Sequence, residues 1–442
     1  MLCTEGNELT IQAENQRKAK INDNGSGRAV YIVDSAYIII DGLYARSTDN
    51  SGSKFGYPFF TTRNNHITLR NLAARNPNRY ANTHAIAVEY SQDVLVEDSE
   101  AYVFHRHCVE AYASQRVVVR RQYCNPRGGK IPGGFGLDQG PLGSGAAVVT
   151  MYPCKDCILE NSIADGTTHP MYLNEMNAAY YGNVPMSGSK VLGSICYKCN
   201  YGNGIYPNSR KVADATNHTP LNITIRDVAI VDYGAPANGI RCSDCVNVTI
   251  DHVTVLGTNT GSNGISADQT STGATASQSS ITITNTVVQD MAGSGYSICS
   301  GCPYSGNHLY SYNNGRAFSP GTPGNWGSTH TGSPGFGACK MWIPAGSPLK
   351  GAGTGGSDIG ATILYRYVNG VLTSAPLWDP ATGEFPHGAS DLDETNRVSG
   401  QSLFDIHTRL NVDTGGCSFP RNYGNSDSDT TRPTAPVGLR AF

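Results

Sequence analysis

Several features common in proteins are missing from this chain of 442 residues, and their absence excludes whole classes of function. Neither sign of charge dominates, because 32 basic residues stand against 35 acidic ones and only 15% of the residues are charged. Such a balance gives no bulk attraction to nucleic acid or to an anionic membrane surface. No apolar run approaches the roughly 20 residues that span a bilayer, since the most apolar stretch, 36–43, is short and contains Asp41. We therefore expect no nucleic-acid partner and no membrane span.

Motifs for bound cofactors are missing as well. The Gly-Lys pair at 129–130 lacks the frame of a phosphate-binding loop, and the chain has no aspartate-rich calcium loop. Attachment of a c-type haem needs His directly after a CxxC pair, but the four pairs are followed by Ile158, Asn200, Val246 and Pro303. We expect no cofactor and no metal, apart from one alternative for the cysteines given below.

What the chain does contain is a recurring phrase of an apolar residue, any residue, an apolar residue, two polar or small residues, and a small or apolar residue. It recurs every 23 to 40 residues, with centres at Ile11, Ile40, Leu69, Val96, Val119, Leu159, Leu192, Ile225, Ile250, Ile283 and, more weakly, Tyr310. Alternation with period two predicts a strand, and recurrence at this distance predicts a stacked array. Helical repeats are excluded because no sustained spacing of three and four residues occurs, and several intervals are too short for the four strands of a propeller blade.

A second pattern accompanies the phrase. Small residues precede six of the centres by five positions, and turn-forming residues follow five of them by two positions. The first set is Ser35, Ser91, Ser114, Cys154, Ser187 and Cys245, and the second is Asn71, Asp98, Asn161, Asp227 and Asn285. Asn and Asp at a fixed offset indicate a turn that needs side-chain capping or left-handed backbone.

One coil per repeat, stacked in parallel, accounts for both patterns with about ten or eleven coils. In this respect residues 1–315 resemble the right-handed parallel β-helix proteins of the pectate-lyase-like superfamily. The segment Gly356-Ser-Asp-Ile-Gly-Ala-Thr-Ile-Leu-Tyr-Arg-Tyr367 is similar to the one that closes such helices in secreted bacterial members. We expect an all-β solenoid at 1–315, a loop-rich C-terminal cap at 316–425, and a linker with the start of a fibronectin type III-like domain at 426–442.

Both ends look like cuts in a longer, modular, exported protein. Too little chain precedes Ile11 for the cap that normally shields a solenoid end. Residues 429–439 resemble the linker and first strand of a fibronectin type III domain, and Met1-Leu2-Cys3 is not a secretory signal. We expect a secreted or cell-surface protein whose signal lies outside this segment.

Thirteen cysteines favour structural disulfides in an oxidising compartment. The residues are Cys154, Cys157, Cys196, Cys199, Cys242, Cys245, Cys299 and Cys302 in four CxxC pairs, then Cys108 with Cys124, Cys339 with Cys417, and the odd Cys3. Structural zinc held by two CxxC pairs of neighbouring coils is the alternative.

The bulkiest intervals, between Val119 and Ile225, are where we expect function, because long insertions in stacked coils carry it. Their Arg, Lys, His and Tyr side chains suit an acidic sugar polymer, since guanidinium pairs with carboxylate and flat rings pack on sugars. The catalytic candidates are Lys130, His169 and Tyr172, with Arg106 just upstream, and the substrate-binding candidates are Arg120, Tyr180, Tyr181, Tyr206 and Arg210.

These residues fit a β-elimination lyase better than a glycoside hydrolase. A lyase needs a base for the C5 proton and a group that neutralises the uronate, whereas a hydrolase needs a carboxylate pair. Asp138, Asp165 and Glu175 are the nearest carboxylates, and the aspartate and arginine signatures of polygalacturonases and pectate lyases are absent. His105 and His107 are expected to be hydrogen-bonded structural residues. No catalytic residue can be transferred by motif.

Two functions follow from these patterns. The first is an extracellular protein that binds or cleaves a polysaccharide along a groove walled by the insertions at 120–225. The second is a non-catalytic surface protein, such as an adhesin, a matrix component or a filament subunit, which self-associates through its coil ends.

Overall fold

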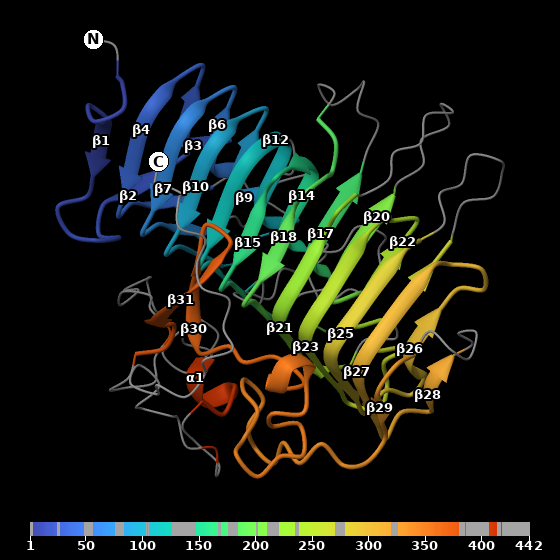
Figure 1. Ribbon diagram of the computed structural model, residues 1–442. Coiled ribbons are helices and arrows are strands. Elements are labelled where there is room, and N and C mark those ends of the chain that lie inside the picture. Colours follow the sequence, from blue (N-terminus) through green and yellow to red (C-terminus); the bar gives the residue numbers. More distant parts are fainter. Residues whose placement is uncertain are drawn as a thin grey trace.

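The recurring phrase forms one side of a right-handed parallel β-helix in a computed structural model of the chain (Figure 1). The structure describes residues 3–23, 27–47, 56–75, 84–102, 104, 106–125, 147–166, 169–175, 184–199, 202–209, 221–234, 238–269, 279–319, 326–379, 385, 406–412 and 417. The expected fibronectin-like segment at 426–442 lies outside these residues.

Each coil contributes a strand to three stacks of parallel strands. The first stack consists of β1 (Leu9–Gln12), β4 (Ala36–Asp41), β7 (Asn65–Arg70), β10 (Gln92–Glu97), the second half of β12 (His107–Arg120), β15 (Ile158–Glu160), β18 (Lys190–Leu192) and the first halves of β21 (Thr224–Tyr233), β23 (Val248–Gly257), β25 (Ile281–Gln289) and β27 (Tyr304–Tyr312). The phrase centres lie in this stack.

The other two stacks complete the coils. The second contains β2 (Lys20–Asn22), β5 (Tyr44–Arg46), β8 (Ala73–Arg75), β11 (Glu100–Tyr102), β13 (Tyr123–Asn125), β16 (Ile163–Asp165), β19 (Ile195–Tyr197), the second halves of β21, β23, β25 and β27, and β29 (Thr329–His330). The third contains β3 (Arg28–Val33), β6 (Tyr57–Thr62), β9 (His84–Glu89), the first half of β12, β14 (Ala147–Lys155), β17 (His169–Glu175), β20 (Ile205–Ser209), β22 (Ile240–Ser243), β24 (Ile265–Asp268), β26 (Ser294–Ile298) and β28 (Arg316–Ser319). Parallel pairing therefore continues past residue 315, to His330.

Two of the predicted phrase centres, Leu192 and Tyr310, are assigned to the wrong residue of their strands. The structure pairs Leu159 with Val191, and Val191 with Ile225, so Val191 and not Leu192 is the central residue of its coil. In the last copy Gly306 pairs with Ile283, while Tyr310 pairs with Val287 in the second stack. The first error arises because the adjacent apolar residues Val191 and Leu192 fit the phrase equally well. The second arises because Gly306 has no apolar side chain to mark the centre, whereas Tyr310 on the following stack does.

The second pattern marks the turn that follows the first stack. The position two residues after each centre has positive φ in every coil after the first: Gly42, Asn71, Asp98, Arg121, Asn161, Gly193, Asp227, His252, Asn285 and His308. Gly, Asn and Asp adopt this left-handed backbone at low cost, which explains their recurrence.

Small polar residues form hydrogen-bond ladders between the coils. The Ser91 N–H donates to Ser114 Oγ at 3.1 Å, and the Asn64 N–H donates to Ser91 Oγ at 3.1 Å. These bonds satisfy backbone donors at the corners, where the parallel ladders are interrupted.

The C-terminal region packs against the side of the solenoid (Figure 1). It contains a 3₁₀ turn (Thr354–Gly356), an antiparallel hairpin of β30 (Tyr365–Val368) and β31 (Val371–Pro376), and the short helix α1 (Ile406–Arg409). Its apolar side chains, including Trp342, Ile363 and Trp378, are buried together with the outer side of the second stack. No helix in the described part of the chain is long and apolar enough to cross a membrane.

Candidate functional site

The third stack brings several of the predicted residues to one surface. Arg106 directly precedes β12, Tyr206 lies in β20, and His169 and Tyr172 belong to β17, where the structure describes their backbone. Pairing places Tyr172 between Thr150 of β14 and Tyr206 of β20. Lys130, Tyr180, Tyr181 and Arg210 lie outside the described residues.

A dense group of aromatic and titratable side chains occupies the N-terminal part of this stack. We call it the outer cluster; it consists of Arg28, Tyr31, Tyr57, Phe60, His84, Glu89, His107, Glu110, Thr150 and Tyr152. It lies outside the main core, because Tyr57, Phe60 and Ala87 form an apolar cluster of their own. Strand pairing explains the grouping, since residues in register on adjacent coils are direct neighbours.

The aromatic half of the outer cluster is a continuous set of ring contacts. The Phe60 ring stacks on Tyr31 and on Tyr57, with centroids 5.3 and 5.0 Å apart. The Arg28 guanidinium carbon lies 4.6 Å from the Tyr31 centroid and 4.7 Å from the Phe60 centroid. Tyr31 lies at the exposed edge of the cluster, whereas Phe60 is buried.

The polar half joins two histidines to a carboxylate. The rings of His84 and His107 stack with centroids 4.7 Å apart, and His84 Nε2 lies 2.9 Å from Glu110 Oε2. His107 Nδ1 is 2.9 Å from Thr150 Oγ1. The expectation of a hydrogen-bonded His107 thus agrees with this contact, and His105 lies outside the described residues.

Burial and neighbouring charges raise the pKa of two further groups, Glu89 and Tyr57. Burial, together with the charge of Glu110, raises the pKa of Glu89 to about 7, although Arg28 opposes the rise. Burial also raises the pKa of Tyr57, with Glu110 and Glu89 adding to the effect and Arg28 and Arg106 opposing it. At neutral pH the Glu89 carboxyl group therefore carries a proton part of the time.

Further along the third stack, Tyr206 adds an aromatic residue on the strand that pairs with β17. The Arg241 guanidinium lies 5.5 Å from the Tyr206 centroid and is held by Asp268, with Arg241 Nη2 2.7 Å from Asp268 Oδ2. Ser243 Oγ donates to Asp268 Oδ1 at 2.5 Å. The predicted binding residue Tyr206 is therefore on the same face as the outer cluster.

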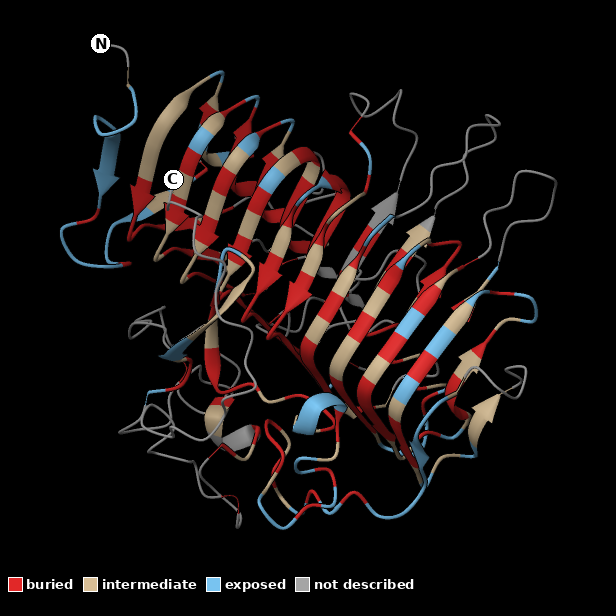
Figure 2. Cartoon of the chain, in the orientation of Figure 1, coloured by how far each residue is buried: buried red, intermediate tan, exposed pale blue. Residues whose placement is uncertain are grey.

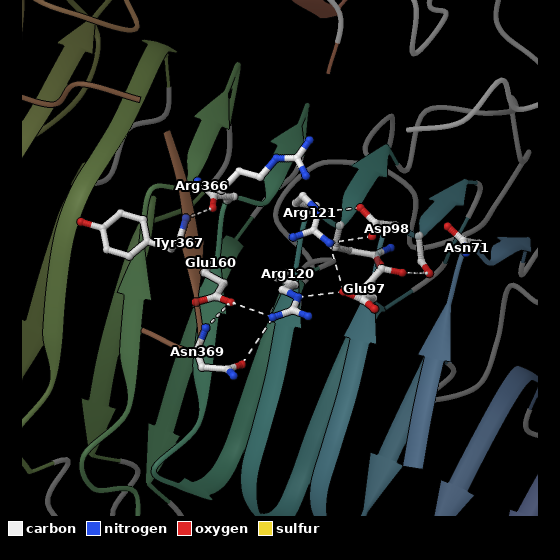
Figure 3. A network of polar contacts seen from close by, with 12 residues as sticks. Asn71, Glu97, Asp98, Arg120, Arg121, Glu160, Arg366, Tyr367 and Asn369 are labelled. Atoms are coloured by element: carbon white, nitrogen blue, oxygen red, sulfur yellow. Dashed lines mark hydrogen bonds and ion pairs between the residues drawn. The ribbon is translucent and has the colours of Figure 1, made fainter. Parts of the chain in front are cut away.

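Arg120 lies elsewhere, at the end of β12 in the first stack (Figure 3). Its Nε is 2.8 Å from Glu97 Oε2, and its Nη1 is 3.7 Å from Glu160 Oε1. Glu160 also accepts hydrogen bonds from the Asn369 and Gly370 N–H groups at 3.0 and 2.9 Å. The structure thus separates Arg120 from the other candidates and places it where the C-terminal hairpin docks.

The left-handed turn residues supply further docking contacts. The Tyr367 N–H donates to Asn161 Oδ1, and the Asn161 amide donates to the Tyr365 carbonyl. The Tyr367 hydroxyl donates to the buried Asp227 carboxylate. These contacts hold the hairpin against the turns that follow the first stack.

Of the three carboxylates predicted for a hydrolase, the structure describes the side chain of Asp165. Asp165 is buried in the second stack, where it accepts hydrogen bonds from the Tyr123 hydroxyl at 2.7 Å and the Asn125 amide at 3.1 Å. Asp138 lies outside the described residues, and only the backbone of Glu175 is described.

The cysteines pair as the disulfide interpretation predicts. Bonds join Cys108–Cys124, Cys154–Cys157, Cys196–Cys199, Cys242–Cys245, Cys299–Cys302 and Cys339–Cys417. Their Cα atoms are 5.0 to 6.1 Å apart, which is the usual range for disulfides. Cys3 is a free thiol.

No family model matches the sequence, and no curated protein matches it. Among solved structures, the chain is similar to the Dettilon tailspike protein, with 12% identity, a TM-score of 0.46, and coverage of 75% of this chain and 63% of the tailspike. It is also similar to PfbA, a surface adhesin of Streptococcus pneumoniae, with 13% identity, a TM-score of 0.35, and coverage of 70% and 60%.

A third similar structure is the catalytic unit of a GH87 α-1,3-glucanase from Streptomyces thermodiastaticus, with 10% identity, a TM-score of 0.39, and coverage of 73% and 59%. The chain spans less than two thirds of the length of each of these proteins. At such identities the similarity concerns the fold alone and transfers no residue role.

Sequence reasoning missed most of the outer cluster, including Tyr57, His84, Glu89 and Glu110. The sequence does contain a signal for this cluster. His84 and His107 are 23 residues apart, the same distance that separates the phrase centres Val96 and Val119. Applying the coil intervals to the third stack would have placed the two histidines on adjacent strands.

Proposed function

We propose that the protein is an extracellular β-helix protein that binds a polysaccharide across the outer side of the third stack. The observation that carries the proposal is the exposed edge of the outer cluster, where Tyr31 is 45% exposed and the Arg28 guanidinium lies over the Tyr31 and Phe60 rings, with the partly exposed Tyr206 and Arg241 further along the same stack. Flat rings pack on the faces of sugars, and polar groups around them bind hydroxyl groups.

The coil repeat supports a polymeric ligand over a small one. Parallel strands about 4.8 Å apart present equivalent side chains at regular steps, so successive sugars can meet successive coils. Six disulfides favour an oxidising, extracellular setting. Arg28 and Arg106 on the same surface favour a polymer that carries carboxylates.

A binding experiment with matched variants tests the proposal. Affinity gel electrophoresis against neutral and uronate polysaccharides should show retardation by at least one polymer, and Tyr31→Ala should weaken that binding about tenfold, as expected for loss of roughly 1.4 kcal/mol at an aromatic contact. Tyr37→Ala is the control, because Tyr37 stacks on His66 in the first stack, with centroids 4.6 Å apart. The proposal fails if no polymer is retarded or if both variants weaken binding equally.

Cleavage is measured in the same samples. Ultraviolet absorbance reports the unsaturated product of a lyase, and reducing ends report either kind of cleavage. Product formation would add catalysis to binding, while binding without product would leave the protein a carbohydrate-binding surface protein.

Self-assembly is a second candidate function, favoured by the first coil. β1 is drawn as an exposed strand in Figure 2 and pairs with β4 on one side. Its residues Leu9 and Ile11 are 49% and 47% exposed. An exposed apolar strand end can pair with another copy. Light scattering with electron microscopy should show assemblies that Ile11→Lys abolishes; monomers at all concentrations would exclude self-assembly.

A further inference from the structure

Three residues of the outer cluster, His84, His107 and Glu110, lie close enough together to hold one ion. His84 begins β9, and His107 pairs with it at the start of β12. Glu110 follows three residues later on the same strand. One atom of each residue lies within 4.8 Å of the other two.

All three side chains are sequestered from solvent. His84 and His107 are each 2% exposed, and Glu110 is 3% exposed. A carboxylate and two imidazoles are expensive to bury unless they are paired or bind a metal.

We propose that His84, His107 and Glu110 form a binding site for a divalent transition metal of the zinc class. Two imidazoles and one carboxylate are the ligand set of three-ligand zinc sites, which keep a fourth position for water or another oxygen ligand. Imidazole ligands favour zinc and similar ions over calcium and magnesium, which take oxygen ligands. The sequence alone led us to expect no metal, and the proposal replaces that expectation at this site.

The hydroxyl of Thr150 orients one ligand. Its contact of 2.9 Å with His107 Nδ1 allows that nitrogen to donate to Oγ1, which leaves Nε2 as the metal-binding atom. Thr150 is fully buried on β14, the strand that follows β12 in the third stack. It is a positioning residue, not a ligand.

Binding requires the cluster to rearrange: an imidazole nitrogen binds a metal in the plane of its ring, and the rings of His84 and His107 are stacked with their planes 8° apart, so one ring must turn toward the ion. Ligand atoms about 2.1 Å from a tetrahedral zinc lie about 3.4 Å from one another. His84 Nε2 and Glu110 Oε2 are already closer than this, at 2.9 Å, so the ion would separate this pair slightly and draw His107 inward. Both imidazoles bind as neutral ligands, so affinity should fall with falling pH.

Isothermal titration of the full chain with zinc chloride tests the site without any polysaccharide, so its result does not depend on the proposed function. All proteins carry Cys3→Ser, because the free thiol could itself bind zinc. Disulfides are kept oxidised, and the protein is treated with EDTA and then dialysed. One zinc per chain is expected, with weaker binding of calcium chloride.

Three variants and one control locate the site. Glu110→Gln and His107→Gln should each weaken zinc binding more than 100-fold, while Thr150→Val should weaken it about 10- to 100-fold, the range for outer partners of ligands. His66→Gln, a histidine of the first stack, should leave binding unchanged. Circular dichroism checks that each variant is folded.

If a variant fails to fold, a spectroscopic measurement on the protein with its three ligands unchanged still tests the site. Cobalt(II) bound to the unmodified ligands should give the intense visible bands of a four-coordinate site, and zinc should displace it. Binding of less than one ion per two chains, octahedral cobalt bands, or equal affinity in Glu110→Gln would overturn the proposal and leave the cluster as a histidine–carboxylate ion pair.

Discussion

Asp251 offers a quantitative test of how the turn residues stabilise the coils. Its Oδ1 accepts hydrogen bonds from Thr284 Oγ1 at 2.7 Å and from Asn285 Nδ2 at 2.9 Å, and its Oδ2 lies 2.9 Å from His252 Nδ1. Burial alone would raise the pKa of Asp251, but these hydrogen bonds and the charge of His252 lower it to about 2 from 3.8.

The lowered pKa gives the expected size of the effect. A change from 3.8 to about 2 corresponds to about 2 kcal/mol of stabilisation by the ionised form. Since the pKa is depressed in the folded state, this stabilisation is complete above about pH 4 and is lost as the pH falls toward 2. Asp251→Asn should therefore lower the free energy of unfolding by about 2 kcal/mol at pH 7, and by little near pH 2.

Two measurements check this prediction. Urea unfolding gives the cost at each pH, and native-state hydrogen exchange in β23 and β25 shows whether the loss is local. Asp34→Asn is the control, because Asp34 and its partner Arg63 are both exposed and should contribute nothing measurable. An equal cost for Asp251→Asn at pH 7 and pH 2.5 would refute the electrostatic reasoning, because it would show that packing alone is affected.

Two further predictions concern the docked hairpin and the outer cluster. Glu160→Ala removes the acceptor of the Asn369 and Gly370 N–H groups and should lower the stability of the docked hairpin by about 1–3 kcal/mol. The loss should appear as faster hydrogen exchange in 365–376 but not in the first coils. Unchanged exchange in 365–376 would contradict the docking role. Glu89, with its pKa raised from 4.5 to about 7 by burial and by Glu110, binds a proton more readily in the folded state, so the stability of metal-free protein should fall as the pH rises from 4.5 to 7. Glu89→Gln should remove this fall in pH-dependent thermal unfolding, and an unchanged pH profile would show that Glu89 is not the group responsible.

The solenoid is predictable from the sequence because residues that tolerate a left-handed backbone recur at a fixed distance from the phrase centres. Asn71, Asp98 and Asn161 mark left-handed turns by their spacing from the phrase centres, and their positive φ values confirm that interpretation. The register was less certain where two apolar residues adjoin, as at Val191 and Leu192. There the phrase fits both residues, and only pairing with the neighbouring strands decides which one faces the core.

The candidate site was harder to predict, because its residues come from strands that the phrase does not describe. Interval length drew attention to the insertions and to Arg120, whose partners Glu97 and Glu160 are in neighbouring strands of the first stack. The outer cluster instead depends on register in the third stack, where Phe60 and His84 carry no motif. From the sequence alone, a buried histidine or phenylalanine cannot be distinguished from an ordinary core residue.

The most direct test of the central claim is hydrogen exchange measured by mass spectrometry with and without a polysaccharide that binds. Binding across the third stack predicts protection in peptides covering β3, β6, β9 and the first half of β12, with no change in β4, β7 and β10 of the first stack. Protection confined to the first stack, or to the C-terminal hairpin, would contradict the assignment of the outer cluster as the binding surface.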